Sequence, residues 1–269
     1  MGSVPPPPPA ATPIRLAILK TDSPIPAVSS KVGQFDTIFT TLLRAACASL
    51  DPPQTLESQL TLTAHDVVAA PAVTGEDSDS GWDYPDPDTI DAVLITGSRA
   101  SAYDEDEWVV RLAAFVRRLL DEGRVRVIGV CFGHQIVARA LGARVAPSPA
   151  GWELSVTEVR LSEEGRAVFG GESLNIYQTH RDVVLELPPG VVPLASTEKC
   201  PIQAMYIPRQ LITVQGHPEY TPFIMNEMLQ ARHKRGAIAD GPFEDAMKRV
   251  ADKHDGVAIA RVFLRFLRE

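Results

Sequence analysis

The segment GVCFGHQ, residues 129–135, begins at the end of an apolar run, VRVIGV, residues 125–130. An uninterrupted apolar run is typical of a central parallel strand that helices cover on both faces. Small residues two positions before and after a reactive side chain allow the sharp strand-to-helix turn that holds it above a sheet. Gly129 and Gly133 occupy both positions around Cys131. The sequence therefore predicts a strand, a tight turn at Cys131 and a helix.

The helix after the turn is predicted from Ile136 to Leu141. A sulfur near a helix N-terminus lies at the positive end of the helix dipole, which favours the nucleophilic thiolate form. The alternative is that Cys131 is a small buried residue beside glycines used for packing, since free cysteines are often buried and inert. The rest of the sequence is needed to distinguish a reactive Cys131 from a packing residue.

Strand-like and helix-like patterns alternate on both sides of this turn. Before it, strands are predicted at residues 14–19, 60–68 and 91–96, and helices at 35–46 and from the N-cap pair Asp104 and Glu107 to Gly123. After it, strands are predicted near 153–160, 173–179, 202–207 and 211–216, with helices that begin at Thr221 and that contain Val257, Ala260, Phe263, Leu264 and Leu267. This order predicts an α/β fold of the flavodoxin-like, doubly wound type. We expect a mostly parallel central sheet with helices on both faces and a small additional β-sheet region.

Two stretches stand apart from this alternation. Residues 1–13 are rich in proline, which cannot join a hydrogen-bonded ladder, so they are predicted to form a disordered tail. Residues 70–89 are rich in Pro, Asp, Gly and Ser and are predicted to be a surface insertion. The rest, residues 14–269, is predicted to be one domain.

Charge and cysteine usage narrow the classes of partner. The chain has 26 Lys and Arg against 34 Asp and Glu, a net charge of −8, so neither nucleic acid nor an anionic membrane is an expected partner. No apolar run reaches the ~18 residues of a membrane span. The odd number of cysteines, at wide spacings, gives no disulfide framework and suits a reducing compartment. We expect a cytoplasmic protein.

A second motif, QGHPEY at residues 215–220, follows the apolar run LITV. His217 could take a proton from Cys131 and later deliver it to a leaving amine, while Glu219 could orient the imidazolium. The alternative is an ordinary histidine paired with a surface glutamate.

Together, GVCFGHQ and QGHPEY resemble the class I glutamine amidotransferase family. Its nucleophile motif reads G-x-C-x-G-x-Q, and its distal motif carries histidine, proline and glutamate in that order. The resemblance implies a catalytic triad of Cys131, His217 and Glu219. It also implies cysteine-dependent hydrolysis of a γ-glutamyl amide through a γ-glutamyl thioester.

The resemblance extends to substrate-binding positions. It implies that Gln135 helps to bind the glutamyl group, and that YQTHRD, residues 177–182, is the family's H-x-D region, with His180 and Asp182 at the substrate. An ordinary polar strand end is the alternative for this short pattern.

A tetrahedral intermediate needs donors aimed at its oxyanion. The amide of Phe132 is the first predicted donor. The family usually has Gly-Gly-Pro after its third strand, where this chain has Gly97-Ser98-Arg99. We therefore expect Gly97 to contact the substrate and the amide of Ser98 to be the second donor.

Three functions remain open from the sequence. Stand-alone family members of this length with a CFGHQ motif look like γ-glutamyl peptidases, which cleave glutathione-type conjugates, and this is the leading hypothesis. The alternatives are a glutaminase subunit that supplies ammonia to a separate synthase partner, and a non-catalytic binding protein on the same fold.

A metal site is the remaining alternative for the same residues. Cys131 and His134 have C-x-x-H spacing, and His180 and His217 could in principle complete a zinc site. No second Cys or His pair has ligand spacing. We therefore expect neither a metal nor a cofactor.

Overall fold

The structure is a computed structural model that describes residues 12–68 and 82–269. Most of the predicted tail, residues 1–13, and most of the predicted insertion, residues 70–89, lie outside the described residues.

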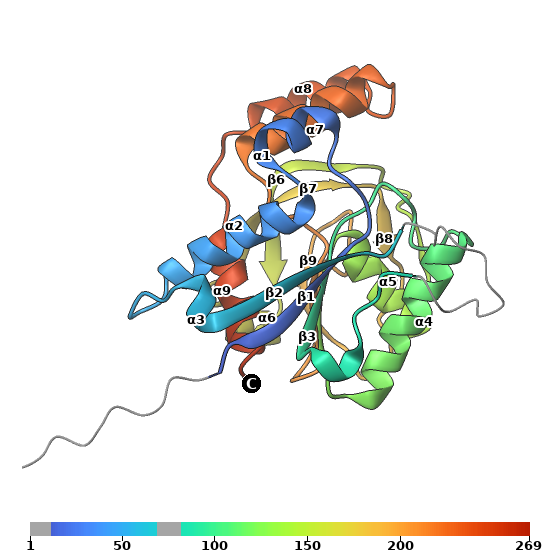
Figure 1. Ribbon diagram of the computed structural model, residues 1–269. Coiled ribbons are helices and arrows are strands. Elements are labelled where there is room, and N and C mark those ends of the chain that lie inside the picture. Colours follow the sequence, from blue (N-terminus) through green and yellow to red (C-terminus); the bar gives the residue numbers. More distant parts are fainter. Residues whose placement is uncertain (1–11, 69–81) are drawn as a thin grey trace, which may run out of the picture.

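A nine-stranded sheet runs through the molecule (Figure 1). One half is parallel, in the spatial order β2-β1-β3-β4-β11. Its strands are β1 (Ile14–Lys20), β2 (Leu60–Asp66), β3 (Ala92–Ile95), β4 (Arg126–Val130) and β11 (Leu211–Val214). The strand that precedes Cys131 therefore has parallel neighbours on both sides, as its apolar sequence predicts.

The sheet continues past β11 with antiparallel strands in the order β10-β9-β6-β7. They are β10 (Ala204–Ile207), β9 (Val192–Ser196), β6 (Glu153–Leu161) and β7 (Ser173–His180). A separate two-stranded sheet pairs β5 (Val145–Pro147) with β8 (Asp182–Val184). The predicted α/β fold, with a parallel core, helices around it and a small extra sheet, is confirmed.

Helices cover both faces of the parallel half, because successive strand residues point to opposite sides. Leu16 and Ile18 of β1 face a core that includes α2 (Phe35–Ala48) and α9 (Gly256–Phe266). The alternate residues, Ala17 and Leu19, face a second core. That core includes α4 (Glu107–Glu122) and α5 (Phe132–Ala140). In Figure 1 the two helix pairs lie on opposite sides of the strands.

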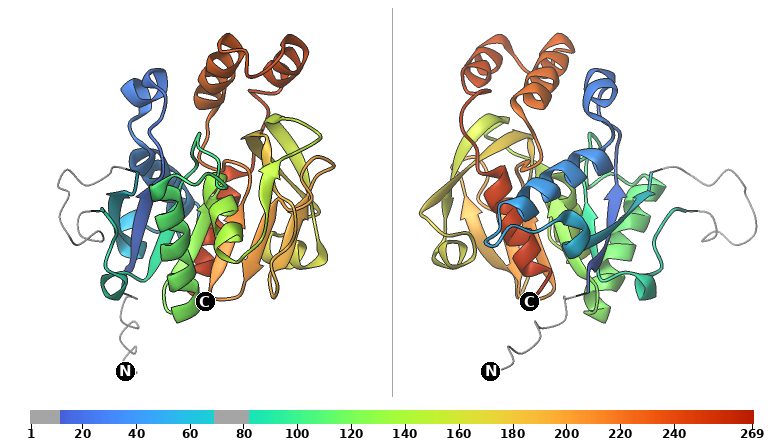
Figure 2. Two further views of the ribbon diagram at one scale, coloured as in Figure 1. Left: turned by 90° about the vertical axis from the view of Figure 1, so that its right-hand side faces the viewer. Right: turned by 60° about the vertical axis from the view of Figure 1, so that its left-hand side comes forward.

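The remaining helices are α1 (Pro26–Val32), α3 (Leu56–Gln59), η1 (Pro87–Thr89), α6 (Glu163–Phe169), α7 (Pro222–Lys234) and α8 (Asp240–Lys248). Both views of Figure 2 show α1, α7 and α8 together above one end of the sheet. This is the end at which the parallel strands finish, since β1 leads upward from Ile14 to Lys20 and then to α1. Ligand sites of open α/β sheets lie at that end. No helix in the described ranges is long and apolar enough to cross a membrane.

Two predicted helix starts were wrong. Helix α4 begins at Glu107 with Asp106 as its N-cap residue, and the Asp104 carboxylate instead accepts the amide of Ser101 at 3.0 Å. Helix α5 begins at Phe132, four residues before the predicted start at Ile136.

Candidate active site

Cys131 lies on a sharp turn between β4 and α5. Its φ of 54° and ψ of −104° are uncommon for a residue with a side chain, and such strain often occurs at functional sites. A Cβ atom on Gly129 would lie 2.5 Å from the Gly133 carbonyl oxygen, and one on Gly133 would lie 2.3 Å from the Ile95 carbonyl oxygen. The turn therefore needs both glycines, and the predicted strand, turn and helix are present.

His217 comes from the neighbouring strand. β11 pairs in parallel with β4, with Val214 opposite Val130, and the chain after β11 carries the histidine. A Cβ atom on Gly97 would lie 2.9 Å from His217 Cε1 and 3.5 Å from Cys131 Cβ. The thiol and the imidazole, 86 residues apart in the sequence (217 − 131), thus meet beside Gly97.

Glu219 holds the imidazole from the other side. Its Oε1 lies 2.8 Å from Nδ1 of His217, and both side chains are buried. The ring of Tyr220 stacks on the imidazole with 4.1 Å between centroids. Nε2 of His217 has no hydrogen-bond partner within the described ranges and is available for proton transfer.

The electrostatics of the group favour a charged imidazole. Burial lowers the pKa of His217, but the negative charges of the Cys131 thiolate and of Glu219 outweigh it and raise that pKa to about 10. An imidazolium beside a thiolate is the arrangement that an activated cysteine nucleophile requires.

Two backbone amides near the sulfur are free. The amides of Phe132 and Ser98 donate no hydrogen bond to any residue that the structure describes, whereas the amide of Gly133 donates to the Thr96 carbonyl at 3.2 Å. The Thr21 hydroxyl lies 3.0 Å from the Gly97 carbonyl oxygen and steadies the turn that carries Ser98.

The predicted substrate-binding residues also meet. Gln135 donates its side-chain amide to the Asp182 carbonyl at 2.9 Å and to Gln215 at 3.0 Å. Nδ1 of His180 lies 3.1 Å from the same Asp182 carbonyl. The Asp182 carboxylate accepts the Ser101 hydroxyl at 2.9 Å. The turn between β7 and β8 is therefore tied to helix α5.

Two pockets open beside Cys131. The first has apolar walls from α1, α2 and α7, which include Ile25, Val28, Phe35, Ile38, Ile224 and Met228. The second is polar and contains the predicted substrate residues Gln135, His180 and Asp182. Cys131, Ser98, Arg99, Thr179 and Arg232 line both pockets. The sulfur thus lies where an apolar and a polar pocket adjoin.

Comparison with known proteins agrees with this geometry. The family model for glutamine amidotransferase class-I matches residues 68–233, which is more than half of the chain. The chain belongs to the class I glutamine amidotransferase family. A glutamine amidotransferase-like protein of Schizosaccharomyces pombe is 34% identical over 255 residues, covering 94% of this chain and 98% of that protein.

Relatives that are named for an activity match a smaller part of the chain. Gamma-glutamyl peptidase 3 of Arabidopsis thaliana is 35% identical over 154 residues, which cover 55% of this chain and 61% of that protein. Among solved structures, a glutamine amidotransferase of Thermotoga maritima has a TM-score of 0.69 at 14% identity, covering 96% of this chain and 100% of that one. At that identity the solved structure supports the fold alone.

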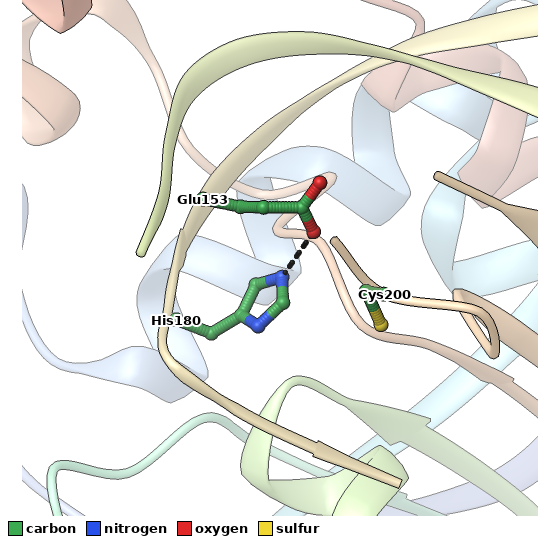
Figure 3. A group of neighbouring side chains, drawn as sticks. All are labelled: Glu153, His180 and Cys200. Atoms are coloured by element: carbon green, nitrogen blue, oxygen red, sulfur yellow. Dashed lines mark ion pairs between the residues drawn. The ribbon is translucent and has the colours of Figure 1, made fainter. Parts of the chain in front are cut away.

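One polar cluster of the protein has the residue types of a metal site (Figure 3). Glu153 lies 3.0 Å from Nε2 of His180, with Cys200 nearby. The Glu153 carboxylate already accepts from the Thr197 hydroxyl at 2.6 Å and from the Gln203 amide at 2.7 Å. Burial raises the pKa of the Cys200 thiol, which donates to a backbone carbonyl at 3.4 Å. The Glu153 carboxylate thus lies between the His180 ring and its two hydrogen-bond donors, Thr197 and Gln203.

The four residues of the predicted zinc alternative do not come together in the structure. His134 binds the Thr213 hydroxyl through Nδ1 at 2.8 Å, and burial lowers its pKa to about 3. Among the described residues, the mutually close group is Glu153, His180 and Cys200, and it includes neither Cys131 nor His217.

Sequence reasoning missed three residues of the site. Tyr220 ends the QGHPEY motif, and its position three residues after His217 was the available hint. Glu153 and Arg232 come from β6 and α7 and carry no local pattern. Their positions depend on how distant elements pack.

Proposed function

We propose that the protein hydrolyses γ-glutamyl amides, with Cys131 as nucleophile, His217 as general base and acid, and Glu219 as the residue that orients His217. The proposal rests on one observation: Cys131 and His217 both lie beside Gly97, and Glu219 contacts the other side of the His217 ring. The family membership supports the same reaction class.

The reaction would proceed in two acyl transfers. The Cys131 thiolate attacks the γ-carbonyl carbon, and the carbonyl oxygen becomes an oxyanion that the amides of Phe132 and Ser98 bind, each worth about 3 kcal/mol. His217 gives its proton to the leaving nitrogen as the C–N bond breaks, which leaves a γ-glutamyl thioester. His217 then takes a proton from water, the hydroxide attacks the thioester, and glutamate departs as the thiolate returns.

The two pockets divide the substrate between them. Gln135, His180 and Asp182 give the polar pocket the character that a glutamyl group needs, so we assign that group to it. The apolar pocket would then receive the leaving group. Apolar walls favour a leaving group larger and less polar than ammonia, and the relatives named gamma-glutamyl peptidases support the same choice.

A direct test compares leaving groups. Purified protein is incubated with glutamine, with glutathione and with a glutathione S-conjugate, and release of ammonia and of glutamate is measured. We expect glutamate from the peptide substrates, fastest from the conjugate. If ammonia were released from glutamine, no peptide substrate were cleaved, and the release depended on a co-purified synthase, the glutaminase-subunit alternative would be favoured.

The nucleophile is tested by Cys131→Ala. We expect this substitution to lower glutamate release at least about a thousandfold, because the covalent step is lost. The matched control is Cys47→Ala, since Cys47 is free and buried in α2, away from both pockets. Full activity of the Cys131→Ala protein would refute the proposal, and failure of wild-type Cys131 to react with a glutamine-analogue electrophile would favour a non-catalytic binding protein.

The cellular setting is proposed on chemical grounds. All three cysteines, Cys47, Cys131 and Cys200, are free and buried. A thiol nucleophile persists in a reducing compartment, so we propose that the protein acts in the cytoplasm.

A further inference from the structure

Arg232 lies where the two pockets adjoin Cys131. It follows Ile224 and Met228 at four-residue intervals on α7, so the three side chains share one face of the helix. All three line the apolar pocket, and Arg232 alone of them also lines the polar pocket.

The guanidinium group is on the polar side of this junction. Its central carbon lies 4.7 Å from the centroid of the Trp152 ring, and Trp152 lines the polar pocket but not the apolar one. The contact between a cation and an aromatic face holds the group in place without neutralising its charge.

No carboxylate pairs with this charge within the described residues. Arg232 forms no ion pair and no side-chain hydrogen bond there, and its Nε is buried without a partner. Burial lowers its pKa, and this effect outweighs the opposite influence of Tyr220 and Cys131, so the cation has lost water without a full counter-charge. Arg99, which lines the same pockets, is already paired with Asp22 at 2.6 Å.

An unpaired cation of this kind is costly unless a ligand supplies the anion. The same pocket contains Asp182, whose carboxylate accepts only the Ser101 hydroxyl. A cation and an anion in one pocket match the two charges of an α-amino acid end, with its carboxylate and its ammonium group.

We propose that Arg232 is a specificity-determining residue that binds the α-carboxylate of the γ-glutamyl substrate, held in position by Trp152. The inference rests on the proposed function for the identity of the substrate. Arginine suits the role because its planar donor fork can bind both carboxylate oxygens at once.

The test measures binding, so that it does not depend on turnover. In the Cys131→Ala background, calorimetry gives the Kd of L-glutamine and of 4-aminobutanamide, which is the same chain without the α-carboxylate. We expect Arg232→Met to weaken L-glutamine binding by about 10- to 100-fold, the usual worth of a charged hydrogen bond, and to leave 4-aminobutanamide unchanged. Arg232→Lys should lie between the two.

The matched control is Arg235→Met, because Arg235 is exposed at the end of the same helix, lines neither pocket and donates to the Ala231 carbonyl. Equal weakening of both ligands by Arg232→Met would show a structural role and overturn the inference. So would unchanged L-glutamine binding, or no measurable binding at all. Weakened binding of γ-glutamylglycine with unchanged binding of L-glutamine would assign Arg232 to the leaving group instead.

The same data separate this inference from the proposed function. Arginine-dependent binding of L-glutamine, with no hydrolysis of any γ-glutamyl amide by the wild-type protein, would refute the function and keep the role of Arg232. Hydrolysis by the wild-type protein, together with L-glutamine binding that Arg232→Met leaves unchanged, would support the proposed function and refute the role of Arg232.

Discussion

The charge of His217 depends on its two negative neighbours, the Cys131 thiolate and Glu219. Because its pKa is raised to about 10, the imidazolium is present at neutral pH and is lost as the pH rises through that value. Glu219→Gln removes one of the two charges, so the pKa of His217 should fall. We expect the alkaline limb of the pH–rate profile for glutamate release to move to lower pH, with a rate loss of at least about tenfold.

Glu244→Gln is the control for this shift, since Glu244 is exposed on α8 and lines neither pocket. An alkaline limb that stays in place in Glu219→Gln would mean that Glu219 does not tune the imidazole.

At the scale of single elements, the turn before α5 depends on backbone contact at Gly133. A methyl group there would overlap the Ile95 carbonyl oxygen, so Gly133→Ala should push α5 away from β3. We expect a stability loss of about 1–3 kcal/mol in urea denaturation and slower alkylation of Cys131 by iodoacetamide.

Gly241→Ala is the control for this substitution, because a Cβ atom on Gly241 in α8 would have no neighbour within 4 Å. It should be neutral or slightly stabilising. If Gly133→Ala matched Gly241→Ala in stability and alkylation, the close packing at the turn would be unimportant.

Elements with a strong pattern could be predicted, and short ones could not. The apolar runs before Cys131 and His217 identified β4 and β11, and the periodic face of residues 35–46 identified α2. Helix α1 was missed because a seven-residue helix is stabilised by its tertiary packing more than by its own sequence. The start of α4 was misplaced because several acidic residues precede it and only one can be the cap.

At the scale of the whole molecule, α9 packs beside α2 in the core on one face of the sheet. Phe263 of α9 is fully buried in that core. Phe263→Ala should lower the free energy of unfolding by about 3–5 kcal/mol, measured by urea denaturation. Val257→Ala on the same helix should change it by less than about 0.5 kcal/mol, because Val257 is 38% exposed. Equal effects would mean that α9 contributes little to the core.

The fold and the meeting of Cys131 with His217 could be predicted because two local motifs and the element order indicated them. The Cys131 turn and the His217–Glu219 pair each occupy a few consecutive residues. The place of Arg232 could not be foreseen, since its contact with Trp152 joins residues 80 positions apart (232 − 152) that share no local pattern. Nor could the four antiparallel strands be joined to the central sheet from their sequences alone.

The in-register pairing of β4 with β11 separates two tasks within one protein. The Cys131 amide donates to the Val214 carbonyl at 2.9 Å, so strand pairing fixes the start of the Cys131 turn against the end of β11 before any substrate arrives. The walls of the apolar pocket come largely from α1, α2 and α7, which lie outside that sheet. The side chains of these walls can therefore change without moving the Cys131 turn or the chain that carries His217.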